Sequence, residues 1–87
     1  MAVKLITYDL NSPGQNHKAV LEKIKTYAWA RLSESSYAVD STDTASGLYQ
    51  KFKPLLDRND TFLVIPLSKP FAGRATQDVL DWLNARL

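Results

Sequence analysis

Residues 3–15, VKLITYDLNSPGQ, join a strand pattern to the start of a helix. In VKLITY, branched or aromatic residues alternate with polar ones, which is typical of a strand, and the Asn-Ser-Pro-Gly cluster then ends it. Ser12 is placed as an N-cap, with Pro13 at the first helical position and Gln15 three residues after the cap, which is the pattern of a capping box. A strand followed directly by a helix therefore opens the predicted fold.

The residues that follow carry one apolar stripe at helical spacing. Lysines and a glutamate take the other side, as expected of a helix that packs against one face of a sheet. The stripe consists of Val20, Leu21, Ile24, Tyr27 and Ala28.

From Trp29 the apolar period changes from helical to alternating. WARLS and SYAVDS each alternate with period two, and the short polar pair Glu34-Ser35 separates them. This pattern predicts two strands joined by a tight hairpin or a bulged bend.

A second helix is expected to open at Thr42 or Asp43. Pro54 should kink or restart it, because the proline ring cannot donate a hydrogen bond to the carbonyl of Gln50 and crowds it. The apolar face of this helix is predicted to carry Ala45, Leu48, Phe52, Leu55 and Leu56.

The last strand, residues 61–67 (TFLVIPL), is apolar on both faces, which predicts cover from both sides. Two helices cover one face of a small sheet, so the C-terminal segment, a second subunit or both should cover the other. Residues 73–87 predict a third amphipathic helix. The order of elements predicts one α+β domain over residues 1–87, a ferredoxin-like βαββαβ sandwich with an added C-terminal helix.

Length and composition narrow the class of protein. The chain has 87 residues, 45% of them hydrophobic and 23% charged, and no apolar run approaches the roughly 20 residues that cross a bilayer. The first ten residues lack the features of a signal peptide, so we expect a soluble, cytoplasmic protein that does not enter a membrane. The absence of cysteine excludes disulfides and thiolate metal sites, and a single histidine disfavours a zinc site within one chain. A chain this short would gain stability from self-association.

Asp9, at the end of the first strand, is the main candidate for chemistry. A carboxylate there can ligate Mg²⁺, which accepts sites made of one or two carboxylates plus water. The alternative is an aspartate that accepts hydrogen bonds from backbone amides of the following turn. One carboxylate per chain is too little for two-metal chemistry, but a two-fold dimer would supply a pair.

Basic side chains are candidates for phosphate contacts. The net charge is +2, and the basic residues are spread along the chain rather than gathered in a tail. Lys18, Lys25 and Arg31 are the candidates for nucleic-acid contacts, against the alternative of a solvated surface. His17 is expected to be a solvated histidine on a helix surface.

Aromatic residues could stack on unpaired bases, but in a small domain they more often belong to the core. These residues are Tyr8, Trp29, Tyr37 and Tyr49.

Three stretches together resemble the family of CRISPR-associated protein 2 and the related virulence-associated protein D. They are ITYDL at the end of the first strand, RLSESSYAV after the first helix, and Asp60 together with FLVIPL at residues 62–67. The resemblance covers about residues 3–66, and its most specific element is the Tyr8-Asp9 step. It implies a ferredoxin-like homodimer whose sheets face each other, with two copies of Asp9 sharing Mg²⁺ in members that cut RNA or DNA.

Two stretches depart from that family. The loop NSPGQNHK lacks the arginines that many members carry there, and the C-terminus is helical where they often have a further strand. With DLNSPG, Trp29 and the helical tail, the chain resembles a looser set of small bacterial and phage proteins of the same superfamily.

The sequence therefore leads to two hypotheses of different classes. The first is a small homodimer that associates with nucleic acid and cleaves phosphodiester bonds through paired Asp9 and Mg²⁺. The second is a non-catalytic dimeric scaffold that binds another protein through a sheet edge or an apolar patch.

Overall fold

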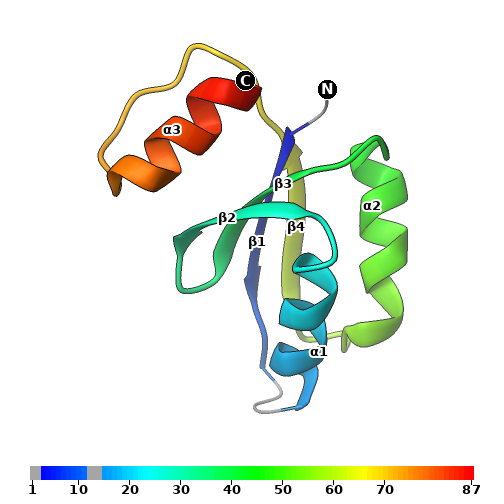
Figure 1. The fold of residues 1–87 in the computed structure, drawn as a ribbon. Helices are drawn as coiled ribbons and strands as arrows, with labels where there is room; N and C mark the ends of the chain where they lie inside the picture. Colours follow the sequence, from blue (N-terminus) through cyan, green and yellow to red (C-terminus); the bar gives the residue numbers. More distant parts are fainter. Residues whose placement is uncertain (1–2, 12–14) are drawn as a thin grey trace.

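The structure, a computed structural model, describes residues 3–11 and 15–87. Its four-stranded antiparallel sheet has the strand order β2-β3-β1-β4 (Figure 1). Helices α1 and α2 lie on one side of this sheet and α3 lies on the other, which confirms the predicted α+β class and element order. The elements are β1 (Val3–Asp9), α1 (Gln15–Ile24), β2 (Ala28–Ser33), β3 (Ser36–Asp40), α2 (Ala45–Phe52), the short 3-10 helix η1 (Lys53–Leu55), β4 (Thr61–Pro66) and α3 (Gln77–Arg86).

The central strand β1 alternates its side chains between the two faces of the sheet. Ile6 and Tyr8 point toward α1 and α2 and are buried, whereas Val3 packs on the opposite face against α3. Residues that lie directly opposite each other on neighbouring strands point to the same face of the sheet. Ile6 thus lies between Tyr37 of β3 and Val64 of β4.

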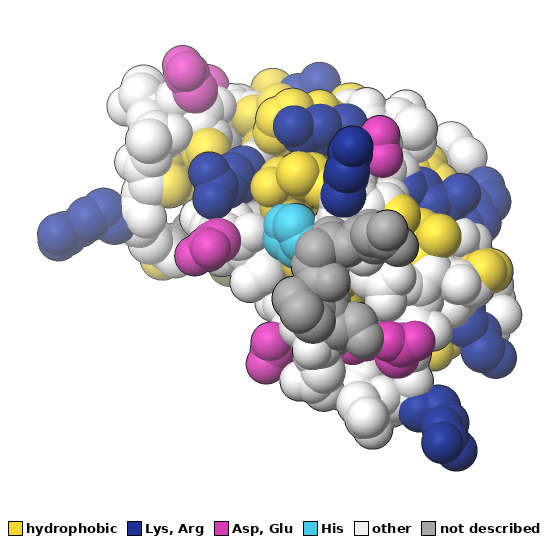
Figure 2. All heavy atoms as spheres, turned by 90° about the horizontal axis from the view of Figure 1, so that it is seen from below, with side chains coloured by type: hydrophobic (Ala, Val, Ile, Leu, Met, Phe, Trp, Pro, Cys, Tyr) yellow, Lys and Arg dark blue, Asp and Glu magenta, His cyan; other side chains and the backbone are white. Residues whose placement is uncertain are grey.

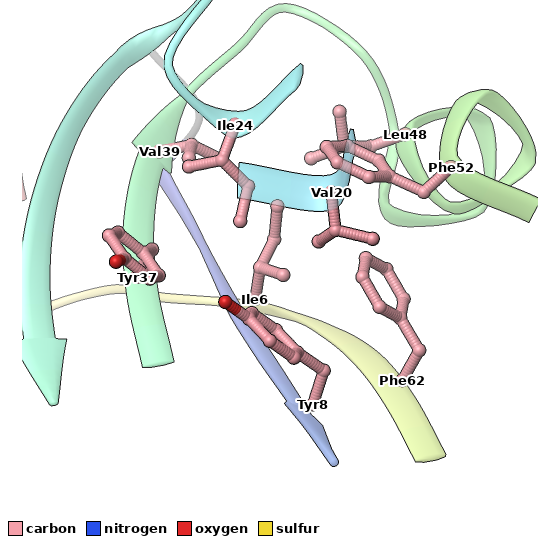
Figure 3. Packing of buried hydrophobic residues seen from close by; sticks show 9 residues of the cluster. All are labelled: Ile6, Tyr8, Val20, Ile24, Tyr37, Val39, Leu48, Phe52 and Phe62. Carbon is pink, nitrogen blue, oxygen red and sulfur yellow. The ribbon is translucent and has the colours of Figure 1, made fainter. Parts of the chain in front are cut away.

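The main core lies between the sheet and the first two helices (Figure 3). Four of its side chains come from these helices at the predicted apolar positions, and the others from β1, β3 and β4. Its members are Ile6, Tyr8, Val20, Ile24, Tyr37, Val39, Leu48, Phe52 and Phe62.

The first helix is shorter than its apolar stripe predicts. α1 ends at Ile24, Tyr27 lies in the following turn, and Ala28 is the first residue of β2. The Thr26 hydroxyl donates to the Lys23 carbonyl over 2.7 Å, which satisfies a carbonyl at the helix end. The chain then gains strand pairing with β3 instead of further helical bonds. The predicted cap residues 12 and 13 lie outside the described residues.

The second helix begins later than expected, with Thr44 rather than Thr42 or Asp43 as its N-cap. The Thr44 hydroxyl accepts a hydrogen bond from the Gly47 amide over 2.9 Å. Asp43 is engaged in a turn of its own, since its amide donates to the Ser41 hydroxyl over 3.0 Å.

The prediction that Pro54 interrupts the second helix is confirmed. The α-helix stops at Phe52, and Pro54 restarts the chain as the 3-10 helix η1. The β2–β3 connection is also confirmed: Glu34 and Ser35 form the tight turn, and the register shifts between Arg31 and Ser33.

The second face of the sheet is only partly covered. Leu83 of α3 packs with Val3 and Ala38, so the C-terminal segment covers the end of the sheet toward β2, as one of the predicted alternatives requires. The prediction that the last strand is covered on both sides is wrong for the isolated chain: Leu63 is 52% exposed and Ile65 is 42% exposed. The reason is that α3 packs beside β2, whereas β4 forms the opposite edge of the sheet.

Among residues 3–11 and 15–87, no helix has both the length and the apolar character that crossing a membrane requires.

Candidate functional site

Asp9 ends β1, opposite Thr61 of β4, and its side chain is exposed. Alternation along β1 places it on the second face of the sheet, in line with Leu5 and Thr7 and away from α1 and α2. Within the described residues, its carboxylate has no hydrogen bond or ion pair, and no three carboxylate, histidine or cysteine side chains gather into a metal-binding group. One chain thus contributes one accessible carboxylate at this position.

Four side chains next to Asp9 form what we call the open patch: the half-buried Leu5 and Thr7 of β1 and the exposed Leu63 and Ile65 of β4. Leu5 lies opposite Ile65, and Thr7 lies opposite Leu63, so the four form a compact two-by-two arrangement on one face. Its β4 side chains are about half exposed, although they are large and apolar. An apolar surface of this kind on a sheet face is typical of an interaction site.

One alternative for Asp9 was that it accepts hydrogen bonds from backbone amides of a turn. In the structure, Asp60 accepts such hydrogen bonds. One of its oxygens accepts from the Asn11 amide over 2.8 Å, and the other accepts from the Asp57 amide over 2.8 Å. Asn11 also donates through its side chain to the Asn59 carbonyl. Asp60 therefore ties the segment after β1 to the turn before β4. Sequence spacing gives no signal for the contact with Asn11, because the two residues are far apart in the chain.

Two of the three predicted nucleic-acid contacts lie together. Lys25 follows α1, and its Nζ lies 5.1 Å from the centroid of the Trp29 ring, while Arg31 lies two residues further along β2 on the same face. Lys18 is exposed two helical turns before Lys25. These bases lie on the helix side of the sheet, so one chain does not bring them together with Asp9.

The view from the end where β1 stops and α1 begins shows how charge is distributed (Figure 2). Lysine and arginine side chains occupy several separate places on this face, with carboxylates among them, rather than one continuous basic area. His17 lies at the surface beside apolar side chains, in agreement with the prediction of a surface histidine.

The aromatic residues divide between core and surface. Tyr8 and Tyr37 are each 4% exposed and belong to the core, as predicted. Trp29 is 38% exposed at the β2 edge, with its ring centroid 6.0 Å from that of Tyr37. Tyr49 is half-buried against Phe62. Trp29 is thus the exposed ring that lies beside basic side chains.

The hydroxyl of Tyr8 is a feature that the sequence could not reveal. It is buried, yet it has no hydrogen-bond partner among the described residues. Burial raises the pKa of this hydroxyl, the nearby Tyr37 adds to the rise, and Arg31 opposes it. The His17 ring lies 5.7 Å from the Tyr8 ring. Strand alternation predicts a ring in the core but says nothing about what meets its hydroxyl.

Lys4 is a second residue that the sequence did not single out. It is 3% exposed, and its Nζ donates to the carbonyls of Ser41, over 2.8 Å, and of Asp43. The Asp43 carboxylate in turn pairs with Lys51 at 2.9 Å. The hydrogen bond from Lys51, followed by that from Ser41, holds the pKa of Asp43 below its usual value. This group anchors the segment before α2.

Two adjoining grooves run between α2 and β4, and both include Tyr49 and Phe62. The first, of about 300 Å³, extends over the turn before β4, and the second, of about 320 Å³, extends along the strand. The first is lined by Tyr49, Lys53, Leu56, Asp57, Arg58, Asp60 and Phe62. The second is lined by Ala45, Ser46, Tyr49, Phe62, Leu63 and Val64.

Comparisons with protein-family models, with curated proteins and with solved structures find no match to this chain.

Proposed function

We propose that this chain forms a homodimer that associates with nucleic acid and uses a pair of Asp9 carboxylates, one from each copy, to bind Mg²⁺ and cleave phosphodiester bonds. The observation that carries the proposal is that Asp9 shares a sheet face with the exposed apolar side chains of the open patch.

Burial of the open patch supports dimer formation. Leu63 and Ile65 each leave about half of their surface in water, and burial of apolar area stabilises association by roughly 25 cal/mol per Å² before its entropic costs. A two-fold dimer uses the same surface on both copies, so each open patch covers the other. Asp9 lies two residues beyond Thr7 on β1, and it would therefore stand at the same interface in both copies.

The donor chemistry at that interface suits Mg²⁺. The ion prefers oxygen ligands and is held by one or two carboxylates plus water, which two copies of an exposed Asp9 supply. When bound, the ion polarises a phosphate and lowers the pKa of a water molecule for attack. The chain's own part is to present the carboxylates and to hold nucleic acid, for which Lys25 and Arg31 beside Trp29 are the candidates.

The first experiment measures the oligomeric state by light scattering. Leu63→Glu places a charge in the open patch and is expected to give monomers where the wild type gives dimers. Gln50→Glu adds the same charge at an exposed position of α2 and should leave the dimer intact. A wild type that is monomeric at micromolar concentration would remove the paired-carboxylate mechanism.

The second experiment tests cleavage of labelled RNA and DNA, single- and double-stranded, with Mg²⁺ or Mn²⁺. Asp9→Asn should lose cleavage while it keeps fold and dimer, and Leu63→Glu should lose cleavage together with the dimer. Metal-dependent cleavage that persists in Asp9→Asn would exclude Asp9 from the mechanism.

A second candidate function is a non-catalytic scaffold, favoured by the grooves beside β4. The Leu67 amide donates to the Val3 carbonyl, so by alternation the backbone groups of Phe62 and Val64 face the free edge. An extended apolar segment of another protein could pair there and place side chains over Tyr49. Tyr49→Asp should then abolish partner binding and leave nucleic-acid cleavage unchanged. A Tyr49→Asp variant that keeps partner binding but loses cleavage would favour the nuclease.

A further inference from the structure

The segment between β4 and α3, residues 67–76, lies beside α3 and forms two cavities with it (Figure 1). The larger cavity, of about 440 Å³, includes Lys69 of this segment and Asn84 of α3. The smaller, of about 190 Å³, includes Leu80 of α3. Residues 71–73 line both cavities, so the two adjoin, and we call them together the α3 groove. Neither Asp9 nor any residue of the open patch lines the α3 groove.

Local interactions fix the shape of this segment. The Lys69 Nζ donates to the Asn84 carbonyl over 3.1 Å and so ties the start of the segment to α3. At its other end, the Thr76 hydroxyl caps α3 by accepting from the Val79 amide over 3.4 Å. Gly73 has a φ of 156°, which other residues rarely adopt. The walls of the α3 groove are therefore held in place before a ligand arrives, which lowers the entropic cost of binding.

Two large apolar side chains of the smaller cavity do not belong to either described core cluster. Phe71 is 37% exposed and Leu80 is half-buried. The other large apolar residues of this cavity pack against the second core cluster and supply its floor: Leu32, Val79 and Leu83. An apolar side chain of a ligand would fill this cavity and remove Phe71 and Leu80 from water, which favours binding.

The charges of the α3 groove have one sign. Lys69 lines the larger cavity and Arg74 the smaller, and none of the described residues that line the two is an aspartate or a glutamate. Arg74 is exposed and has no ion pair with any described residue. The carboxylates of α3, Asp78 and Asp81, line neither cavity. The groove thus complements a ligand that carries carboxylates.

We propose that the α3 groove binds an acidic, apolar peptide segment of a partner protein. A large apolar side chain of the peptide occupies the smaller cavity, and its Asp or Glu side chains meet Arg74 and Lys69. A ligand that reaches both cavities must carry carboxylates at two places beside an apolar group, and a short peptide provides this arrangement. The α3 groove shares no residue with the open patch, so the inference goes beyond the proposed function and depends on neither the dimer nor Asp9.

The test selects random linear peptides displayed on phage against the full wild-type chain. Enriched peptides are expected to combine Asp or Glu with Leu, Phe or Trp, and the affinity of one enriched peptide is then measured by fluorescence anisotropy. Phe71→Ser and Arg74→Glu should each weaken its binding about tenfold or more. No enrichment, or enrichment without acidic residues, would overturn the proposal.

Matched variants separate the α3 groove from general effects of charge and exposed apolar area. Trp29→Ser removes an aromatic side chain of nearly the same exposure, 38%, from another face, and Lys18→Glu makes the same charge reversal on α1. Both should bind the peptide as the wild type does. A peptide whose acidic residues are replaced by lysine should prefer Arg74→Glu to the wild type. Equal peptide affinity of Phe71→Ser, Arg74→Glu and the wild type would refute the site.

Two further measurements exclude other occupants of the α3 groove. The Leu63→Glu variant should bind the peptide as tightly as the wild type, whether or not the proposed dimer and cleavage exist. Displacement of the peptide by an oligonucleotide would assign the groove to nucleic acid and overturn the proposal. A dimer that dissociates in Phe71→Ser or Arg74→Glu, seen by light scattering, would make the groove a contact between copies and overturn it as well.

Discussion

Lys4→Met should destabilise the protein far more than a change at an exposed lysine. Lys4 is almost completely buried, and its ammonium group donates to the carbonyls of Ser41 and Asp43. Methionine keeps most of the apolar stem but removes the charge and leaves those carbonyls without this donor. Hydrogen bonds that involve a charged group contribute about 1.5–3 kcal/mol each.

The opposing contribution is the cost of burying the ammonium group, which methionine avoids. Because the Asp43 residue is only half-buried, water can also replace part of one bond. We therefore expect a net loss of about 2–4 kcal/mol, a large share of the 5–15 kcal/mol typical of a folded domain.

Urea unfolding followed by circular dichroism measures this difference. With an m value of about 1 kcal/mol/M, the midpoint should fall by about 2 M or more. Lys51→Met is the matched control, because Lys51 is exposed and its pairing with Asp43 is screened by solvent, so its midpoint should move much less. A Lys4→Met midpoint equal to that of the wild type would mean that desolvation of the ammonium cancels both bonds, and the anchoring role would be refuted.

Three further predictions concern other polar side chains. Tyr8→Phe should leave the free energy of unfolding unchanged or raise it by up to about 1 kcal/mol, because the lost hydroxyl has no described partner; a clear loss in thermal unfolding would mean that it has one. Asp60→Ala should cost about 1–2 kcal/mol in chemical denaturation, since two loop amides lose their acceptor, whereas Asp60→Asn should recover part of it; equal stabilities would contradict the tie. The pKa of Asp43 is lowered by Lys51 and then Ser41, so its contribution to stability is present above the unfolded pKa of about 3.9 and is lost as the pH falls through the folded value. The stability difference between wild type and Asp43→Asn should therefore shrink in acid titrations below about pH 4, and a difference that stays constant to pH 2 would refute the assignment.

Hydrophobic periodicity was sufficient for the type and order of the elements. The spacing of Val20 and Ile24 in one helix, and of Leu48 and Phe52 in the next, depends only on local geometry, and all four side chains are buried in the core. Element ends were less predictable, because they depend on partners elsewhere. Ala28 continues the helical stripe, yet it pairs with Asp40 of β3.

The candidate sites show the same division between local and distant information. The position of Asp9 at the end of the first strand was predicted from local pattern, and alternation along β1 accounts for the face on which it lies. Lys4 binds the Ser41 carbonyl and Asp60 binds the Asn11 amide; both partners lie far away in the chain, and no local pattern encodes such contacts. The missing partner of the Tyr8 hydroxyl is likewise a property of the packed core.

The sheet order also has a consequence for how the chain folds. β1 precedes the other strands in the chain but lies at the centre of the sheet, between β3 and β4. Its register with β4 joins Lys4 to Pro66, across most of the chain. Such long-range closures slow folding, because loop entropy is lost before the contacts compensate for it. During synthesis, the earliest strand must therefore wait for the last one before its hydrogen bonds are complete.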